Sequence, residues 1–137
     1  MEDHFGLSDL EFKKRFADCS LDPSLFSHEA HLRLAWIMID DLGLESAEET
    51  IQNQLQSFVK NLGATDKYHT TITIVAMKAV FHFMQRSRTD NFKDFIIENP
   101  KLKTHFKELI NSHYSFDIFV SENAKSIFLE PDLLPFD

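Results

Sequence analysis

Residues that interrupt regular structure are scarce in this chain, which has three glycines and four prolines among 137 residues. A fold built from many β-hairpins needs glycine, proline, asparagine or aspartate at nearly every turn, so an all-β sandwich or barrel is disfavoured. Fourteen phenylalanines supply aromatic rings for a packed core. We therefore expect residues 1–137 to form one globular helical domain.

Capping residues and hydrophobic periodicity predict about six helices. Ser8 begins a capping box before a helix over residues 9–18, and Ser27 and Gly43 bound a second helix that is apolar around most of its circumference. The remaining helices are predicted from Ser46 to Gly63, from about Tyr68 to Arg86, from Asp90 to Glu98 and from Pro100 to about Asn111. These segments indicate an all-α fold, a single compact bundle of about six helices.

The C-terminal tail is rich in apolar residues and contains Phe128, Leu129, Leu133, Leu134 and Phe136. Such a segment is too apolar to be left in water. We expect the tail to pack across the bundle or across a neighbouring subunit, which would make the protein a homodimer.

Charge and cysteine content narrow the range of partners. The net charge of −8 disfavours nucleic acid, because binding to phosphates requires clustered lysine and arginine. No apolar run approaches the length of a membrane span, and the residues around Glu2 are acidic where a signal peptide is basic. Cys19 is the only cysteine, so an intrachain disulfide is excluded. A cytoplasmic location is expected.

Three of the seven histidines share a distinctive position on their predicted helices. At about 100° per residue, His28 and His31 lie at the N-terminal end of a core-facing stripe, and His69 does so on a later helix. Short connections favour antiparallel neighbours, so these two helices are expected to run parallel and to flank the helix between them. The three imidazoles would then converge on one ligand.

Imidazoles at helix N-termini favour the neutral state, which leaves a ring nitrogen able to accept a hydrogen bond or to ligate a metal. His28, His31 and His69 are therefore predicted to bind a divalent transition metal, zinc or iron, with one position open to water or substrate. Tyr68 and Thr73 are the candidate catalytic residues, because their hydroxyls are expected beside the histidines. The groups that could approach or orient a histidine ring are Cys19, Asp66, Glu130 and Asp132.

Three interpretations of the histidines stay open, since the pattern H-x-x-H is short and common. The first is a small metal-dependent enzyme acting on a small molecule, and the second is a metal-free polar pocket. In the third the histidines are structural, and the protein is a non-catalytic ligand-binding or self-association module.

Three segments carry a resemblance to a known group of proteins. Residues 26–36 read FSHEAHLRLAW, residues 67–73 read KYHTTIT, and Glu130 is followed by Pro-Asp-Leu. Together they resemble a family of small bacterial helical proteins that pairs an H-x-x-H-L-x-x-A segment with a Y-H-x-T-x-T segment and ends in a P-D-L tail. The resemblance implies that the three histidines and the tail belong to one recurrent pattern, and it implies no activity, substrate or cofactor.

Overall fold

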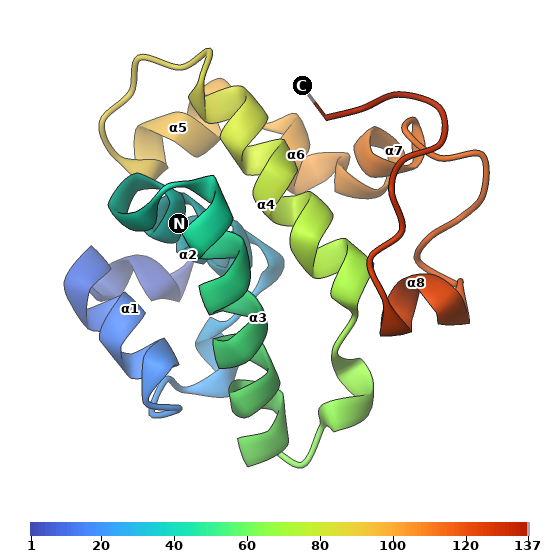
Figure 1. Ribbon diagram of the computed structural model, residues 1–137. Helices are drawn as coiled ribbons and strands as arrows, with labels where there is room; N and C mark the ends of the chain where they lie inside the picture. The colour runs from blue at the N-terminus through green and yellow to red at the C-terminus, as the bar shows by residue number, and fades with distance from the viewer. Residues whose placement is uncertain (137) are drawn as a thin grey trace. The chain divides into compact units, whose positions relative to one another are not determined.

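The computed structural model describes residues 1–136, and within them it contains eight α-helices, three short 3-10 helices and no β-strand. The all-α prediction is confirmed at this level. The chain divides into two compact units, one over residues 1–68 and the other from His69 onward (Figure 1). The arrangement as a single six-helix bundle stays a prediction.

The first unit contains α1 (Asp9–Ala17), α2 (His28–Leu42) and α3 (Leu44–Asn61), with 3-10 helices at Asp3–Gly6, Pro23–Leu25 and Thr65–Lys67. Two predicted N-caps are confirmed, since the Ser8 hydroxyl accepts from the backbone N–H of Glu11 and the Ser27 hydroxyl accepts from that of Ala30. The predicted start of α3 at Ser46 is wrong. That helix begins at Leu44, directly after Gly43.

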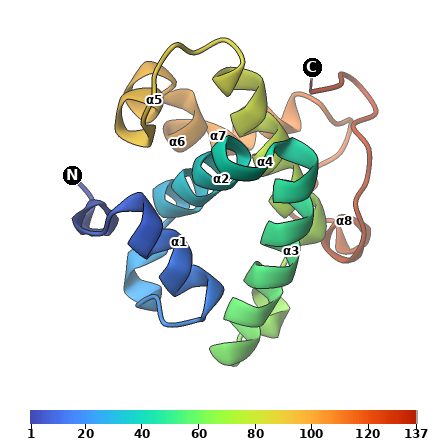
Figure 2. The same ribbon diagram turned by 60° about the vertical axis from the view of Figure 1, so that its left-hand side comes forward.

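Gly43 is the whole connection between α2 and α3. Its φ of +80° and ψ of 164° lie in a region of the backbone map that only glycine occupies readily. Antiparallel helix pairs are joined by loops of about two to five residues, and one residue cannot reverse the chain in that way. Figure 2 accordingly shows α3 running crosswise to α2, which differs from the antiparallel arrangement that we expected for these neighbours.

Aromatic rings join the three helices of the first unit. The ring centroid of Phe16 on α1 lies 5.0 Å from that of Phe26 and 5.0 Å from that of Phe58 on α3. Phe26 in turn lies 5.5 Å from the ring of His31 on α2. Offset and tilted pairs at these separations are favourable beyond their apolar burial, so the phenylalanine-rich composition serves the core here.

The second unit contains α4 (Thr70–Met84), α5 (Phe92–Glu98), α6 (Lys101–Thr104), α7 (Phe106–Asn111) and α8 (Glu122–Ser126). The β-branched start of α4 is helical, as predicted. The helix predicted from Pro100 to about Asn111 is interrupted, because His105 leaves the helical region at φ −133° and ψ 33°. Two short helices, α6 and α7, therefore replace one.

Residues 127–136, hereafter the tail, run back over the second unit after α8 (Figure 1). The buried hydroxyl of Thr71 on α4 donates to the backbone O of Ile127 at 2.7 Å and accepts from the N–H of Leu129 at 3.1 Å. Further along the tail, the N–H of Leu133 donates to the backbone O of His113 at 3.0 Å. Polar anchors therefore hold this apolar segment, and the side chains of Leu133 and Leu134 are exposed.

Candidate functional site

His28 and His31 lie together on the first turn of α2, as their spacing predicts. Nε2 of His31 is shielded from solvent, and no group within residues 1–136 forms a hydrogen bond with it. Burial, with a smaller contribution from His28, lowers the pKa of His31 to about 4. This ring is therefore neutral near pH 7, the state in which an imidazole ligates a metal.

His69 belongs to the second unit, where it caps the N-terminus of α4. Its Nδ1 accepts a hydrogen bond from the backbone N–H of Ile72 at 3.0 Å. Nε2 must then carry the proton, and it donates to the backbone O of Ile118 at 2.9 Å. Burial lowers the pKa of His69. Because both nitrogens are engaged, a metal could bind this ring only in place of one of these bonds, and convergence with His28 and His31 stays a prediction.

The two candidate catalytic hydroxyls differ in their surroundings. Thr73 is buried, and its hydroxyl donates at 2.7 Å to the backbone O of His69, the residue that caps the same helix. The hydroxyl of Tyr68 is shielded from solvent and makes no hydrogen bond with the described part of the chain. The Thr73 hydroxyl is thus occupied structurally, and a catalytic role for either residue stays a prediction.

The other residues that we considered as ring-orienting groups are Cys19, Asp66, Glu130 and Asp132, and Asp66 is exposed in the 3-10 helix Thr65–Lys67. Asp132 accepts hydrogen bonds from the backbone N–H and the hydroxyl of Ser115, and these bonds lower the pKa of the carboxyl. Cys19 follows α1 at a φ of +63°, a left-handed conformation. Glu130 is exposed in the tail.

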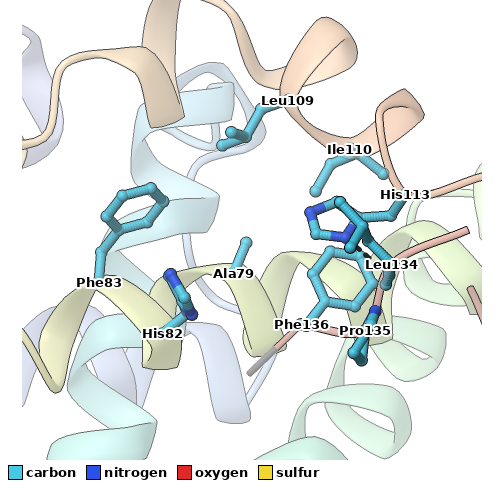
Figure 3. Close-up of a pocket in the computed structure, with 9 residues that line it drawn as sticks. All are labelled: Ala79, His82, Phe83, Leu109, Ile110, His113, Leu134, Pro135 and Phe136. Atoms are coloured by element: carbon cyan, nitrogen blue, oxygen red, sulfur yellow. Dashed lines mark hydrogen bonds between the residues drawn. The ribbon is translucent and has the colours of Figure 1, made fainter.

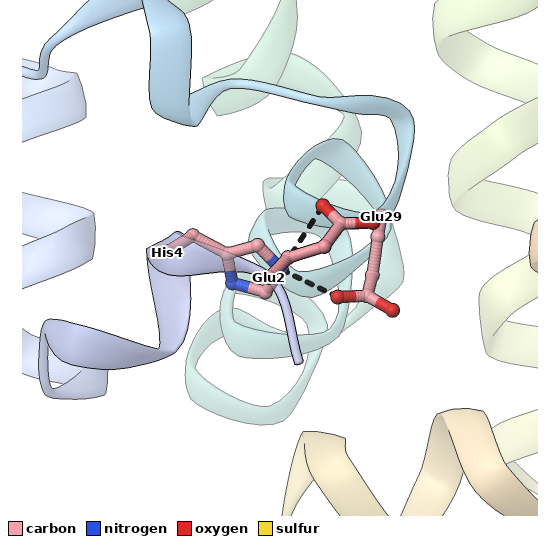
Figure 4. A group of neighbouring side chains, drawn as sticks. All are labelled: Glu2, His4 and Glu29. Atoms are coloured by element: carbon pink, nitrogen blue, oxygen red, sulfur yellow. Dashed lines mark hydrogen bonds and ion pairs between the residues drawn. The ribbon is translucent and has the colours of Figure 1, made fainter.

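A group that sequence reasoning missed lies in the first unit, where Glu2, His4 and Glu29 each direct one ligand-type atom to a common region (Figure 4). These atoms all lie within 4.8 Å of one another. Nε2 of His4 is 2.7 Å from Oε1 of Glu29 and 3.8 Å from Oε1 of Glu2. His4 and Glu29 are buried, so their interaction is shielded from water.

The proton position on His4 distinguishes a hydrogen-bonded network from a metal site. A guanidinium nitrogen of Arg33 lies 3.3 Å from Nδ1 of His4, and because arginine only donates, Nδ1 must be the acceptor. The neutral ring then carries its proton on Nε2 and donates it to Glu29. A metal on Nε2 would move that proton to Nδ1, against the guanidinium, whereas ligating histidines usually direct that N–H at an acceptor. The arrangement therefore fits a hydrogen-bonded network better than a metal centre.

Arg33 completes this network with backbone and carboxylate acceptors. Its buried guanidinium donates to the backbone O of His4 at 2.6 Å, to the backbone O of Leu7 at 2.7 Å and to Oδ1 of Asp9 at 2.9 Å. It also lies 4.8 Å from the ring centroid of Phe12. The network fastens residues 2–9 to α2.

A pocket of about 240 Å³ lies within the second unit (Figure 3). It is lined by Ala79, His82, Phe83, Leu109, Ile110, His113, Leu134, Pro135 and Phe136. Helix α4 and the tail supply opposite parts of the wall, and α7 with the turn after it supplies the rest. The two histidines are the only polar side chains among these lining residues.

His113 is held firmly on one side of the pocket. Its ring stacks on Phe136, with centroids 4.1 Å apart and planes 25° apart. Nδ1 lies 2.8 Å from the backbone O of Leu134, so this nitrogen donates and, in the neutral ring, Nε2 keeps its lone pair. Figure 3 shows Nε2 directed into the pocket, toward the side where Ala79 and His82 lie. The pocket thus has an oriented hydrogen-bond acceptor.

His82 stands on the other side of the pocket, next to Phe83 on α4. A guanidinium nitrogen of Arg86 lies 3.2 Å from its Nδ1 and donates to it, and the same nitrogen lies 3.1 Å from the backbone O of His82. The neutral ring therefore carries its proton on Nε2. Both pocket histidines are consequently oriented by local partners.

Sequence reasoning passed over His82 and His113 because it selected histidines at the N-terminal ends of helical stripes. His113 follows α7, and its ring is placed by the tail, 21 residues further along the chain. The apolar tail with Phe136 was one available signal. Residue spacing, however, cannot show that this tail packs against His113.

Comparison with protein-family models, with curated proteins and with solved structures found no match to this chain. The family resemblance therefore stays a prediction. In the described part of the chain, none of the helices is both long enough and apolar enough to cross a lipid bilayer.

Proposed function

We propose that the second unit binds a small, mainly apolar organic molecule in the pocket between α4, α7 and the tail. The observation that carries this proposal is the composition of the wall, in which seven apolar side chains surround two oriented imidazoles. Small-molecule sites are typically concave and apolar, with a few polar groups that fix the orientation of the ligand.

The volume of the pocket limits the size of the ligand. A buried apolar cavity of about 150 Å³ accommodates benzene, and drug-sized ligands occupy pockets of about 300–1,000 Å³. At about 240 Å³ this pocket suits a molecule of one or two rings. The methyl side chain of Ala79, in the middle of the α4 wall, leaves the space that the ligand would fill (Figure 3).

The lining residues favour binding over catalysis. Nucleophilic catalysis usually requires a hydroxyl, thiol, amine or carboxylate beside a base such as histidine. The wall contributes two imidazoles and otherwise only alanine, phenylalanine, leucine, isoleucine and proline. A non-catalytic ligand-binding module is therefore the function that we propose.

Titration of the ¹⁵N-labelled protein with indole or benzofuran tests this proposal. Either compound is expected to shift the backbone amide signals of residues in the wall, such as Ala79 and Ile110. Ala79→Leu fills the pocket and should abolish these shifts, while Leu109→Ala, which enlarges the same pocket, should keep them. Binding of neither compound to the wild-type protein, or equal binding to Ala79→Leu, would contradict the proposal.

A metal-dependent role is the second candidate function. It is favoured by Nε2 of His31, which is buried without a hydrogen-bond partner in residues 1–136, and is opposed by the two hydrogen bonds of His69. Calorimetric titration of tag-free protein with zinc distinguishes the outcomes. Stoichiometric binding that is lost in both His31→Ala and His69→Ala would support the predicted three-histidine site, and loss in neither variant would exclude it.

A further inference from the structure

We propose that the pocket selects an aromatic molecule that donates a hydrogen bond, of the indole or phenol class, to Nε2 of His113. This inference rests on the proposed ligand-binding function and specifies the chemical class of the ligand. It depends on three features of the wall. They are the tautomer of the His113 ring, the flat apolar surfaces around that ring and the scarcity of other polar side chains.

The acceptor character of His113 follows from its fixed partner. The backbone O of Leu134 can only accept, so Nδ1 of His113 donates to it across 2.8 Å. In the neutral ring the proton is thereby committed to Nδ1, and Nε2 offers a lone pair to the pocket (Figure 3). A ligand meets this lone pair favourably only with an O–H or N–H group.

The position of the ring is fixed as well as its tautomer. Phe136 stacks on His113 at a centroid separation of 4.1 Å, and the backbone N–H of Leu133 donates to the backbone O of His113 at 3.0 Å. An acceptor held from both its ring and its backbone loses little conformational entropy when a ligand binds. Such preorganisation favours selectivity.

The remaining wall favours a flat apolar body on the ligand. Phe83 lies on the side of the pocket opposite the stacked pair of His113 and Phe136, and Ala79 lies between them (Figure 3). Aromatic rings pack well against such surfaces. A two-ring heterocycle therefore fits the space and can turn its polar edge toward His113.

Indole and benzofuran form a matched pair for the test, because they share a two-ring shape and differ in an N–H donor against a ring oxygen. Affinities measured by NMR titration at pH 8, where an ordinary imidazole is neutral, should be about three- to tenfold tighter for indole, as expected for one neutral hydrogen bond. Equal affinities would overturn this inference and leave the proposed ligand-binding function standing. Binding of neither compound would instead contradict the proposed function.

Two substitutions at one position separate the acceptor from the structural bond. In His113→Asn the amide N–H₂ can replace Nδ1 as donor to Leu134, while the acceptor that faces the pocket is lost, so indole should bind no more tightly than benzofuran. In His113→Gln the longer side chain can return an amide oxygen near the position of Nε2, so the preference should be restored at least in part. His105→Asn, at an exposed histidine outside the pocket, is the matched control and should behave as wild type. An unchanged preference for indole in His113→Asn would overturn the assignment of the acceptor.

Discussion

A guanidinium nitrogen of Arg33 lies 3.3 Å from Nδ1 of His4, and this contact determines which nitrogen of the buried imidazole carries its proton. The neutral ring donates from Nε2 to Glu29. Histidine and glutamate are residue types that often bind metals, but His4 and Glu29 here belong to a hydrogen-bonded network. This network joins residues 2–9 to α2.

Removal of Arg33 is expected to destabilise the protein strongly. Arg33→Met deprives the backbone oxygens of His4 and Leu7, and Nδ1 of His4, of their donor. Unpaired buried polar groups cost about 1–3 kcal/mol each, with partial relaxation, so we expect a loss of about 2–4 kcal/mol in the free energy of unfolding. Urea denaturation measures it. Arg15→Met is the control, because its guanidinium is half-exposed and pairs only weakly with Glu11 at 3.5 Å, and its effect should stay within about 0.5 kcal/mol. Similar losses in both variants would show that the network contributes little.

His31 is expected to make the protein sensitive to acid. The unfolded ring binds a proton as the pH falls through about 6.5, whereas burial keeps the folded ring neutral until about pH 4. Protonation of the unfolded state alone lowers stability across this window, by at most about 3 kcal/mol. Between pH 7 and pH 4, wild type should therefore lose more unfolding free energy than His31→Leu. His105→Leu, at an exposed histidine, should follow the wild-type curve, and a His31→Leu curve parallel to wild type would refute the prediction.

Gly43 should be intolerant of any side chain. A Cβ added there meets no atom within 4 Å, but the φ of +80° with ψ of 164° is strained for every other residue. Gly43→Ala is expected to cost about 1–3 kcal/mol of unfolding free energy. Gly6→Ala provides the comparison, because the space around Gly6 is also empty and its φ is not in the left-handed region. If thermal denaturation shows equal effects of the two substitutions, then a side chain at position 43 adds no backbone strain and the prediction is wrong.

Thr71 should control the attachment of the tail. Thr71→Val keeps the shape of the side chain but removes the hydroxyl that donates to Ile127 and accepts from Leu129. We expect a loss of about 1–3 kcal/mol, faster amide hydrogen exchange at Leu129 and weaker indole binding, since the tail forms part of the pocket wall. Thr70→Val, which removes a longer contact of 3.5 Å to Ser126, should change these quantities much less. Unaltered exchange at Leu129 in Thr71→Val would argue that other contacts hold the tail.

Helix identity could be predicted because its signals are local. The serine caps at Ser8 and Ser27 bond to backbone groups three residues away, and the helical period repeats within a few residues. The end of α2 at Gly43 could be predicted for the same reason, because glycine is a local signal for the end of a helix. The crosswise course of α3 was not, since it depends on a connection of one residue whose backbone angles no periodicity encodes.

The sequence by itself determined that this protein is helical, where α1 and α2 begin and which residues are apolar enough for a core. Only the tertiary structure decided which histidines have chemical partners. His4 meets Glu29 across 25 residues, and His113 meets Leu134 across 21. The physical reason is that the lone pair or proton of an imidazole is assigned by the group that faces it, and distant parts of the chain bring that group into place.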